Sequence, residues 1–176
     1  MEINSNDVIG DHAWVWRADH GAGAGWTTNP SDNGLIVNGN NVTYYGLFVE
    51  HFQKDITQWN GDNGRTYFYQ CELPYDPPTQ GDWMHGQVNG WPGYKVADTV
   101  KNHEAWGLGI YAFFTNDGIF CDNALEVPQA PGVMVHHALS IGFKDENGIK
   151  SVINGTGSPT SKKSTKSEVL EYPAPQ

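Results

Sequence analysis

Residues 42–50 read Val-Thr-Tyr-Tyr-Gly-Leu-Phe-Val-Glu, and residues 65–72 read Arg-Thr-Tyr-Phe-Tyr-Gln-Cys-Glu. Each run is short, rich in apolar and aromatic residues, and ends in a glutamate, Glu50 or Glu72. These glutamates are 22 residues apart, within the period of about 20 to 29 residues that some solenoid repeats show. Residues one repeat apart stack on the same face of a parallel solenoid, with strands about 4.8 Å apart. The spacing therefore predicts that the two carboxylates are neighbours.

The residues around these runs repeat as well. Units near residues 34–55 and 56–76 share the order strand, Asn-Gly turn, strand, carboxylate, with Asn38-Gly39 and Asn60-Gly61 as the turns. The runs are short and apolar on both faces, as buried parallel strands are. We predict an all-β fold, a parallel β-helix. A β-sandwich of hairpins gives the same local signals and stays as the alternative.

Few segments show helical periodicity, and Gly, Pro, Asn and Asp divide the chain into short β-rich runs. The expected strands cover residues 13–17, 34–37, 42–49, 56–59, 66–72, 109–114, 119–121, 124–127, 133–143 and 150–153.

Residues 73–108 interrupt this pattern, because prolines exclude a strand over 73–80. The aromatic-rich stretch that follows, which includes Trp83, predicts a long loop that forms a cleft wall. A short helix is expected near 98–105.

The domain organisation follows from composition. A β-helix domain is expected over residues 1–157, and residues 158–176 are expected to form a polar tail with a short docking segment, Val169–Tyr172.

The charge of the chain limits its partners. Twenty acidic residues face ten basic ones, for a net charge of −10, which argues against nucleic acid and against an anionic membrane surface. The chain has no apolar stretch of about 18 residues, so nothing predicts a membrane span. Seven Trp, eight Tyr and seven Phe suit either a sugar-binding surface or an aromatic core. Cys71 and Cys121 lack a metal-type spacing, and a disulfide between them stays open.

The paired glutamates predict acid–base chemistry. Glu72 follows aromatic residues and Cys71, and an apolar surrounding together with a charge on Glu50 would favour its protonated form. Such a group can protonate a glycosidic oxygen while Glu50 orients or deprotonates a water molecule. His51 is expected to point away from this cleft, because adjacent strand residues face opposite sides.

The block 10–21, Gly-Asp-His-Ala-Trp-Val-Trp-Arg-Ala-Asp-His-Gly, supplies binding groups. Trp16 suits a sugar platform, and Asp19 and His20 suit sugar hydroxyls. A metal site that adds Asp11 and His12 is disfavoured, because these neighbours diverge on a strand and no HExxH or cysteine partner exists. The chain also lacks GxSxG, P-loop and Rossmann motifs. We expect no metal and no cofactor.

Several segments together resemble glycoside hydrolase family 55, the bacterial β-1,3-glucanases or laminarinases. They are GDHAWVWRADHG (10–21), NGLIVNGNNVTYYGLFVEHFQ (33–53), WNGDNGRTYFYQCELPYDPP (59–78), YKVADTV (94–100), HEAWGLGIYAFF (103–114) and VINGTG (152–157).

The resemblance, over about residues 7–157, implies two right-handed parallel β-helices side by side and an inverting, exo-type attack on β-1,3-glucan. It implies that Glu72 is the general acid in a Glu-Leu-Pro-Tyr motif and that Glu50 helps to hold the nucleophilic water. Tyr75 would line the sugar site, and Trp16 would stack on a sugar. Family members are several times longer, so we expect this chain to correspond to the C-terminal half. Its exposed face would then self-associate or dock to an N-terminal half.

Three functions remain in view. A glycoside hydrolase acting on β-1,3-glucan is the first, and its activity in a chain of this length is an open question. A non-catalytic glucan-binding module and a structural solenoid are the others. We expect an extracellular, secreted protein whose signal peptide is not in this chain.

Overall fold

The computed structural model describes residues 1–174, and its regular elements are almost all strands. In chain order they are β1 (Glu2–Ile3), β2 (Ile9–Trp16), β3 (Leu35–Val37), β4 (Thr43–Glu50), β5 (Thr57–Trp59), β6 (Gly64–Glu72), the 3-10 helix η1 (Gln80–Asp82), β7 (Met84–His85), β8 (Val88–Asn89), β9 (Tyr94–Val96), β10 (Asn102–Ala112), β11 (Phe120–Cys121), β12 (Leu125–Glu126), β13 (Gly132–Gly142), β14 (Gly148–Ile149) and β15 (Lys166–Tyr172). Within this stretch no helix is long and apolar enough to cross a membrane.

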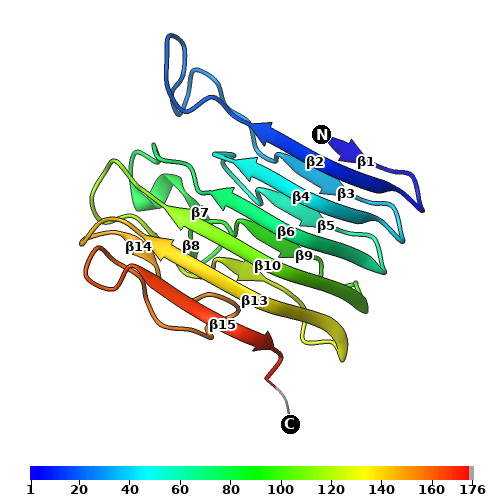
Figure 1. The fold of residues 1–176 in the computed structure, drawn as a ribbon. Helices are drawn as coiled ribbons and strands as arrows, with labels where there is room; N and C mark the ends of the chain where they lie inside the picture. Colours follow the sequence, from blue (N-terminus) through cyan, green and yellow to red (C-terminus); the bar gives the residue numbers. More distant parts are fainter. Residues whose placement is uncertain (175–176) are drawn as a thin grey trace.

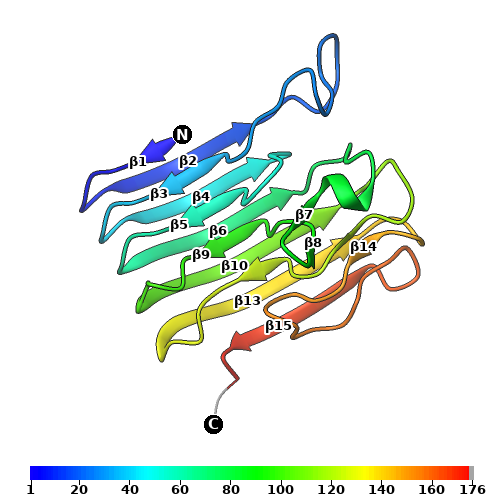
Figure 2. The same ribbon diagram turned by 180° about the vertical axis from the view of Figure 1, so that it is seen from behind.

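The strands stack into parallel sheets that run the length of the molecule (Figure 1). One sheet has the order β15-β13-β10-β6-β4-β2, and the second has the order β1-β3-β5-β9-β12. Figure 2 shows the same stack from behind. Every ladder in these two sheets is parallel except β13–β15. The expected all-β fold of stacked parallel strands is confirmed, and the sandwich alternative is wrong because its hairpin ladders would be antiparallel.

The expected helix near 98–105 is wrong. β10 begins at Asn102, and its first residues alternate between buried and partly exposed positions, with His103 and Ala105 in the core. This period of two fits a strand that is buried on one face. The aromatic-rich loop is also shorter than expected, because Tyr94 and Val96 are fully buried in β9 of the second sheet.

The Asn-Gly turns between the two sheets stack on one another. Asn60 Nδ2 donates to Asn38 Oδ1 at 2.8 Å, so each turn is held by the same turn of the coil before it. A β-carbon on Gly61 would lie 1.9 Å from the carbonyl oxygen of Gly39. Glycine is therefore required by the close approach of backbone to backbone.

One residue in each of the five parallel strands of the large sheet has left-handed backbone geometry, and these residues are in register. They are His12, Gly46, Phe68, Gly107 and His137, with φ between 49° and 67°. The side-chain alternation restarts after this column, so Leu47 and Val49 point into the core. Glu50 consequently lies on the outer face of the sheet.

The core lies inside the coils, between the two sheets. Its largest fully buried side chains include Trp59, Trp83 and Tyr69. Cys71 and Cys121 are both buried and free, which answers the open question of a disulfide. Burial raises the pKa of both thiols well above the usual range.

The C-terminal segment closes one end of the large sheet. β15 pairs antiparallel with β13, from Lys166 opposite Ile141 to Tyr172 opposite Val135. Val169 is mostly buried in this arrangement. The division into a domain over 1–157 and a tail over 158–176 stays a prediction.

Candidate active site

The two glutamates lie side by side at the ends of β4 and β6. These strands pair with an offset of 22 residues, from Thr43 opposite Arg65 to Phe48 opposite Gln70. The same offset carries Glu50 opposite Glu72, and the amide of His51 donates to the Glu72 carbonyl at 2.8 Å. Position and register therefore place both carboxylates at one end of the outer face.

The two carboxylates have different surroundings. Glu50 is 8% exposed, and Trp14 donates its indole N–H to Glu50 Oε2 at 2.8 Å. The Glu72 side chain is 31% exposed and borders a cavity of about 510 Å³ that Tyr111 and Phe113 also line. One carboxylate is thus held by a hydrogen bond under a tryptophan, while the other opens to a cavity with aromatic walls.

Tyr75 donates its hydroxyl to Glu72 Oε2. Burial, the hydrogen bond to Glu72 and nearby negative charges raise the pKa of Tyr75 far above its usual range. The phenol therefore stays protonated and remains a donor. Its ring also packs edge-on against His51, with centroids 4.5 Å apart.

His51 does not point away from the cleft as alternation predicted. β4 ends at Glu50, and His51 has a left-handed φ of 68°, so the alternation of a strand no longer applies. Its Nε2 lies 3.8 Å from Glu72 Oε2 and 3.9 Å from Asp19 Oδ2. The ring is nearly fully buried. His51 is thus one of two residues of this site that sequence reasoning did not place in it.

Asp19 contacts two of the other expected binding residues, Trp16 and His20. Its Oδ1 accepts from the Trp16 indole at 3.2 Å and lies 2.9 Å from His20 Nδ1. Burial opposes ionisation of Asp19, but His51 and the hydrogen bond from His20 outweigh it, and the pKa of Asp19 lies below its usual value. Trp16 is 42% exposed beside this cluster and its ring lies 5.8 Å from that of Trp14. It is therefore placed to offer a surface to a ligand.

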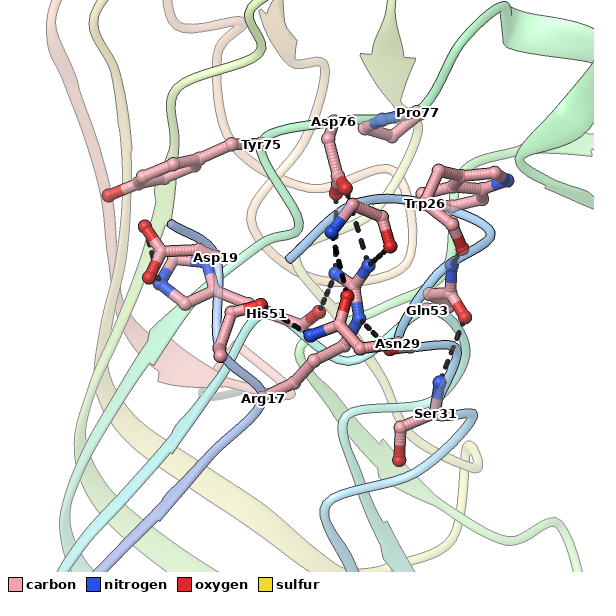
Figure 3. Close-up of polar contacts among 12 residues, drawn as sticks. Arg17, Asp19, Trp26, Asn29, Ser31, His51, Gln53, Tyr75, Asp76 and Pro77 are labelled. Atoms are coloured by element: carbon pink, nitrogen blue, oxygen red, sulfur yellow. Dashed lines mark hydrogen bonds and ion pairs between the residues drawn. The ribbon is translucent and has the colours of Figure 1, made fainter. Parts of the chain in front are cut away.

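Arg17 was also missed, and it holds the loop after β2 against the site (Figure 3). Its guanidinium donates to the carbonyls of Gly25, Asn29 and His51, each at 3.0 Å, and to both carboxylate oxygens of Asp76. A single Arg that follows a strand carries no sequence signal for such a network, because its partners come from three separate segments.

Trp83 is the one proposed binding residue that the structure removes from the site. It is 1% exposed, packs against Phe114 with ring centroids 5.2 Å apart, and donates its indole N–H to the Gln53 carbonyl at 2.9 Å. Both ring faces are covered, so Trp83 cannot stack on a sugar. Its role is to pack the core.

The arrangement combines groups that glycosidic cleavage needs. Glu72 faces a cavity and is in contact with a phenol donor, Glu50 is its immediate neighbour, and Trp16 is the neighbour of Glu50 on the next strand. Among residues 1–174, no group of three His, Cys, Asp or Glu side chains is arranged to hold a metal ion.

Comparison with known proteins places these features in a family. Residues 1–72 match the LAM55 pectate lyase-like domain. An exo-β-1,3-glucanase of Streptomyces sp. (strain SirexAA-E / ActE) is 47% identical over 173 residues, which is 97% of this chain and 29% of that protein. A glucan 1,3-β-glucosidase of Cochliobolus carbonum is 26% identical over 159 residues, 80% of this chain and 18% of that protein.

Solved structures agree with the sequence matches. The structure of sacteLam55A from Streptomyces sp. SirexAA-E superposes with a TM-score of 0.95 and 46% identity, over 98% of this chain and 32% of that one. A variant of sacteLam55A in complex with glucose superposes with the same TM-score and 45% identity. The chain thus spans about a third or less of the proteins it matches.

Proposed function

The chain belongs to glycoside hydrolase family 55, and from this premise we propose that it takes part in the hydrolysis of β-1,3-glucan. The observation that carries the proposal is the in-register pair Glu50 and Glu72 at the end of β4 and β6. Relatives named as an exo-β-1,3-glucanase and a glucan 1,3-β-glucosidase support this substrate class.

In the proposed mechanism Glu72 is the general acid. It protonates the glycosidic oxygen of a sugar bound in the cavity beside Tyr111 and Phe113. Tyr75 orients the Glu72 carboxyl through its hydroxyl. Trp16 stacks on the sugar, and Asp19 and His20 bind its hydroxyls.

Glu50 helps to hold the nucleophilic water on the opposite side of the bond. The hydrogen bond from Trp14 keeps its carboxylate in place. An inverting enzyme needs room for this water between its two carboxyl groups. We propose an inverting, exo-type reaction on β-1,3-glucan.

Three further features belong to the proposal. The coil is right-handed, as nearly all crossovers between parallel strands of one sheet are. The protein acts outside the cell on a polysaccharide. Exposed aromatic side chains on the outer face of the large sheet, among them Trp14 and Phe68, are covered by a second copy or by another β-helix.

The decisive experiment compares glucose release from laminarin by the wild-type chain, Glu72→Gln and Glu104→Gln. The side chains of Glu72 and Glu104 have nearly the same exposure, 31% and 32%, so Glu104→Gln is a matched control. We expect Glu72→Gln to lower the rate by about 10²-fold or more and Glu104→Gln to leave it unchanged. Equal rates in wild type and Glu72→Gln would contradict the role of Glu72. Proton NMR of the fresh product should show α-glucose, and β-glucose would contradict inversion.

A glucan-binding module without turnover is the second candidate. The observation that favours it is the Trp16 ring, which is 42% exposed and offers a stacking surface that requires no catalysis. In that case laminarin binds saturably, Trp16→Ala weakens the binding, and no glucose appears with wild type or with Glu72→Gln.

A further inference from the structure

A second cavity lies apart from the glutamate pair, where the loop after β2 meets the segment that carries η1 and β7. It measures about 400 Å³ and is lined by residues of both segments. None of its lining residues borders the cavity at Glu72. Its volume is within the range of about 300 to 1,000 Å³ typical of ligand sites.

Two tryptophans border this cavity at the edge of the core, against which both are packed. Trp26 and Trp91 are both partly exposed, whereas Trp59 and Trp83 are fully buried. Each of the two indoles is supported from behind. The Arg17 guanidinium lies 5.9 Å over the ring of Trp26, and the rings of His85 and Trp91 are 4.9 Å apart. Rigid aromatic surfaces therefore meet the cavity from two separate segments.

The floor of the cavity is built by a buried side chain. Gln53 is 9% exposed, its Nε2 donates to the Trp26 carbonyl at 2.7 Å, and its Oε1 accepts from the Ser31 amide at 3.0 Å. Figure 3 shows Gln53 and Trp26 on one side of Arg17, with Asp19 and Tyr75 on the other. The loop is thus fixed in place over this cavity, and Arg17 stands between it and Tyr75, the residue that contacts Glu72.

The polar groups at the rim of this cavity include both positively and negatively charged side chains. Lys54 Nζ lies 2.7 Å from Asp32 Oδ2, and Asp82 lies close by with its Oδ2 accepting from Thr79 at 2.7 Å. An ammonium donor beside carboxylate acceptors matches neighbouring sugar hydroxyls, which donate and accept together. Two acids against one base, in a chain of net charge −10, disfavour an anionic ligand.

We propose that this cavity is a second binding site for a neutral β-glucan chain, with Trp26 and Trp91 as stacking surfaces and Lys54 and Asp32 as hydroxyl ligands. The choice of glucan rests on the proposed function, but binding at this site requires no catalysis. The site holds the polysaccharide at a point separate from the bond that is cleaved.

NMR of the indole N–H groups tests the site without disturbing it. Laminarihexaose is titrated into the ¹⁵N-labelled Trp16→Ala chain, in which the platform at the glutamate pair is removed. Signals are assigned with Trp26→Phe and Trp91→Phe. We expect saturable shifts of the Trp26 and Trp91 signals, and an at least tenfold weaker affinity in Lys54→Met. If neither signal shifts, the proposal is wrong.

A matched substitution and an activity assay complete the test. Phe68→Ala also removes an exposed aromatic ring, 61% exposed on the large sheet, and should leave the affinity unchanged. Glucose release is measured separately, with the chain that keeps Trp16. Shifts of Trp26 and Trp91 without hydrolysis support the second site while contradicting the proposed hydrolase. Hydrolysis without these shifts does the reverse.

Discussion

Arg17 and Asp76 form a two-point ion pair, with Nη1 3.2 Å from Oδ1 and Nη2 3.3 Å from Oδ2. The arginine directly follows β2, and the aspartate directly follows Tyr75, so the pair joins segments 59 residues apart. The Arg17 side chain is 2% exposed. It fixes the position of the segment that brings Tyr75 to Glu72.

Removal of the Arg17 guanidinium should therefore destabilise the folded protein. We expect Arg17→Met to lower the free energy of unfolding by about 3 to 5 kcal/mol, since it leaves the Asp76 charge and three carbonyl oxygens without their donor. Arg17→Lys should recover only part of this, because an ammonium cannot form a planar fork. Urea unfolding measures both. A loss below about 1 kcal/mol in Arg17→Met would show that the pair contributes little.

Asp19 should make stability depend on acid pH. Its folded pKa lies below the usual 3.8 because His51 and His20 outweigh burial, so its contribution is complete above pH 3.8 and is lost as pH falls through the lower folded value. The stability difference between wild type and Asp19→Asn should accordingly shrink below pH 3.8. Urea unfolding from pH 2 to 7 measures it. Asp11→Asn, at an exposed position, serves as the control, and a pH-independent difference for Asp19→Asn would refute the expectation.

His103 should affect stability at higher pH than Asp19 does. Its charged form is a cation, whereas that of Asp19 is an anion. Burial lowers its pKa from 6.5 to about 3, although Asp62 raises it slightly. The unfolded chain takes up this proton near pH 6.5 and the folded chain does not. Stability is therefore highest above pH 6.5 and falls toward pH 3, by at most about 1.4 kcal/mol per pH unit. His103→Gln should flatten the slope between pH 3 and 6.5 in thermal or urea unfolding. An unchanged slope would mean that His103 is protonated in the folded state.

Gly61 tests the stacked turns. A β-carbon there would lie 1.9 Å from the Gly39 carbonyl oxygen, so we expect Gly61→Ala to destabilise the protein by about 1 to 3 kcal/mol. Gly81→Ala is the matched control, since its β-carbon would meet only the Thr79 hydroxyl at 3.7 Å. Circular dichroism during thermal unfolding distinguishes the two. Similar melting temperatures would mean that neighbouring turns can move apart.

Much of the fold could be predicted from the sequence because neighbouring coils repeat the same order of strands and turns. The Asn-Gly turns and the spacing of Glu50 and Glu72 each identify the same pairing of β4 with β6. Strands such as β1 and β9 were missed, because two or three residues are too short to show a period. The helix expected at the start of β10 failed because short alternating stretches resemble both structures.

Only part of the candidate active site could be predicted from the sequence, because some of its residues depend on the three-dimensional structure. Glu50 and Glu72 belong to strands whose register follows from sequence, but His51 depends on one backbone angle, and Arg17 on partners from distant segments. Composition alone could not place Trp83, because an aromatic residue in a loop gives the same sequence signal whether it faces a ligand or the core. In the structure Trp83 is buried in the core.

The register of the large sheet is independent of the lengths of the connections between its strands. Trp16, Glu50, Glu72, Tyr111 and Ile141 are consecutive neighbours across five strands, yet the chain takes 34, 22, 39 and 30 residues to pass from one to the next. The connections thus accommodate insertions and deletions, while the spacing of these neighbouring residues in the large sheet stays constant. Connections such as the one that carries Trp26 could be lengthened, shortened or exchanged to change which ligand is held, with Glu50 and Glu72 left as they are.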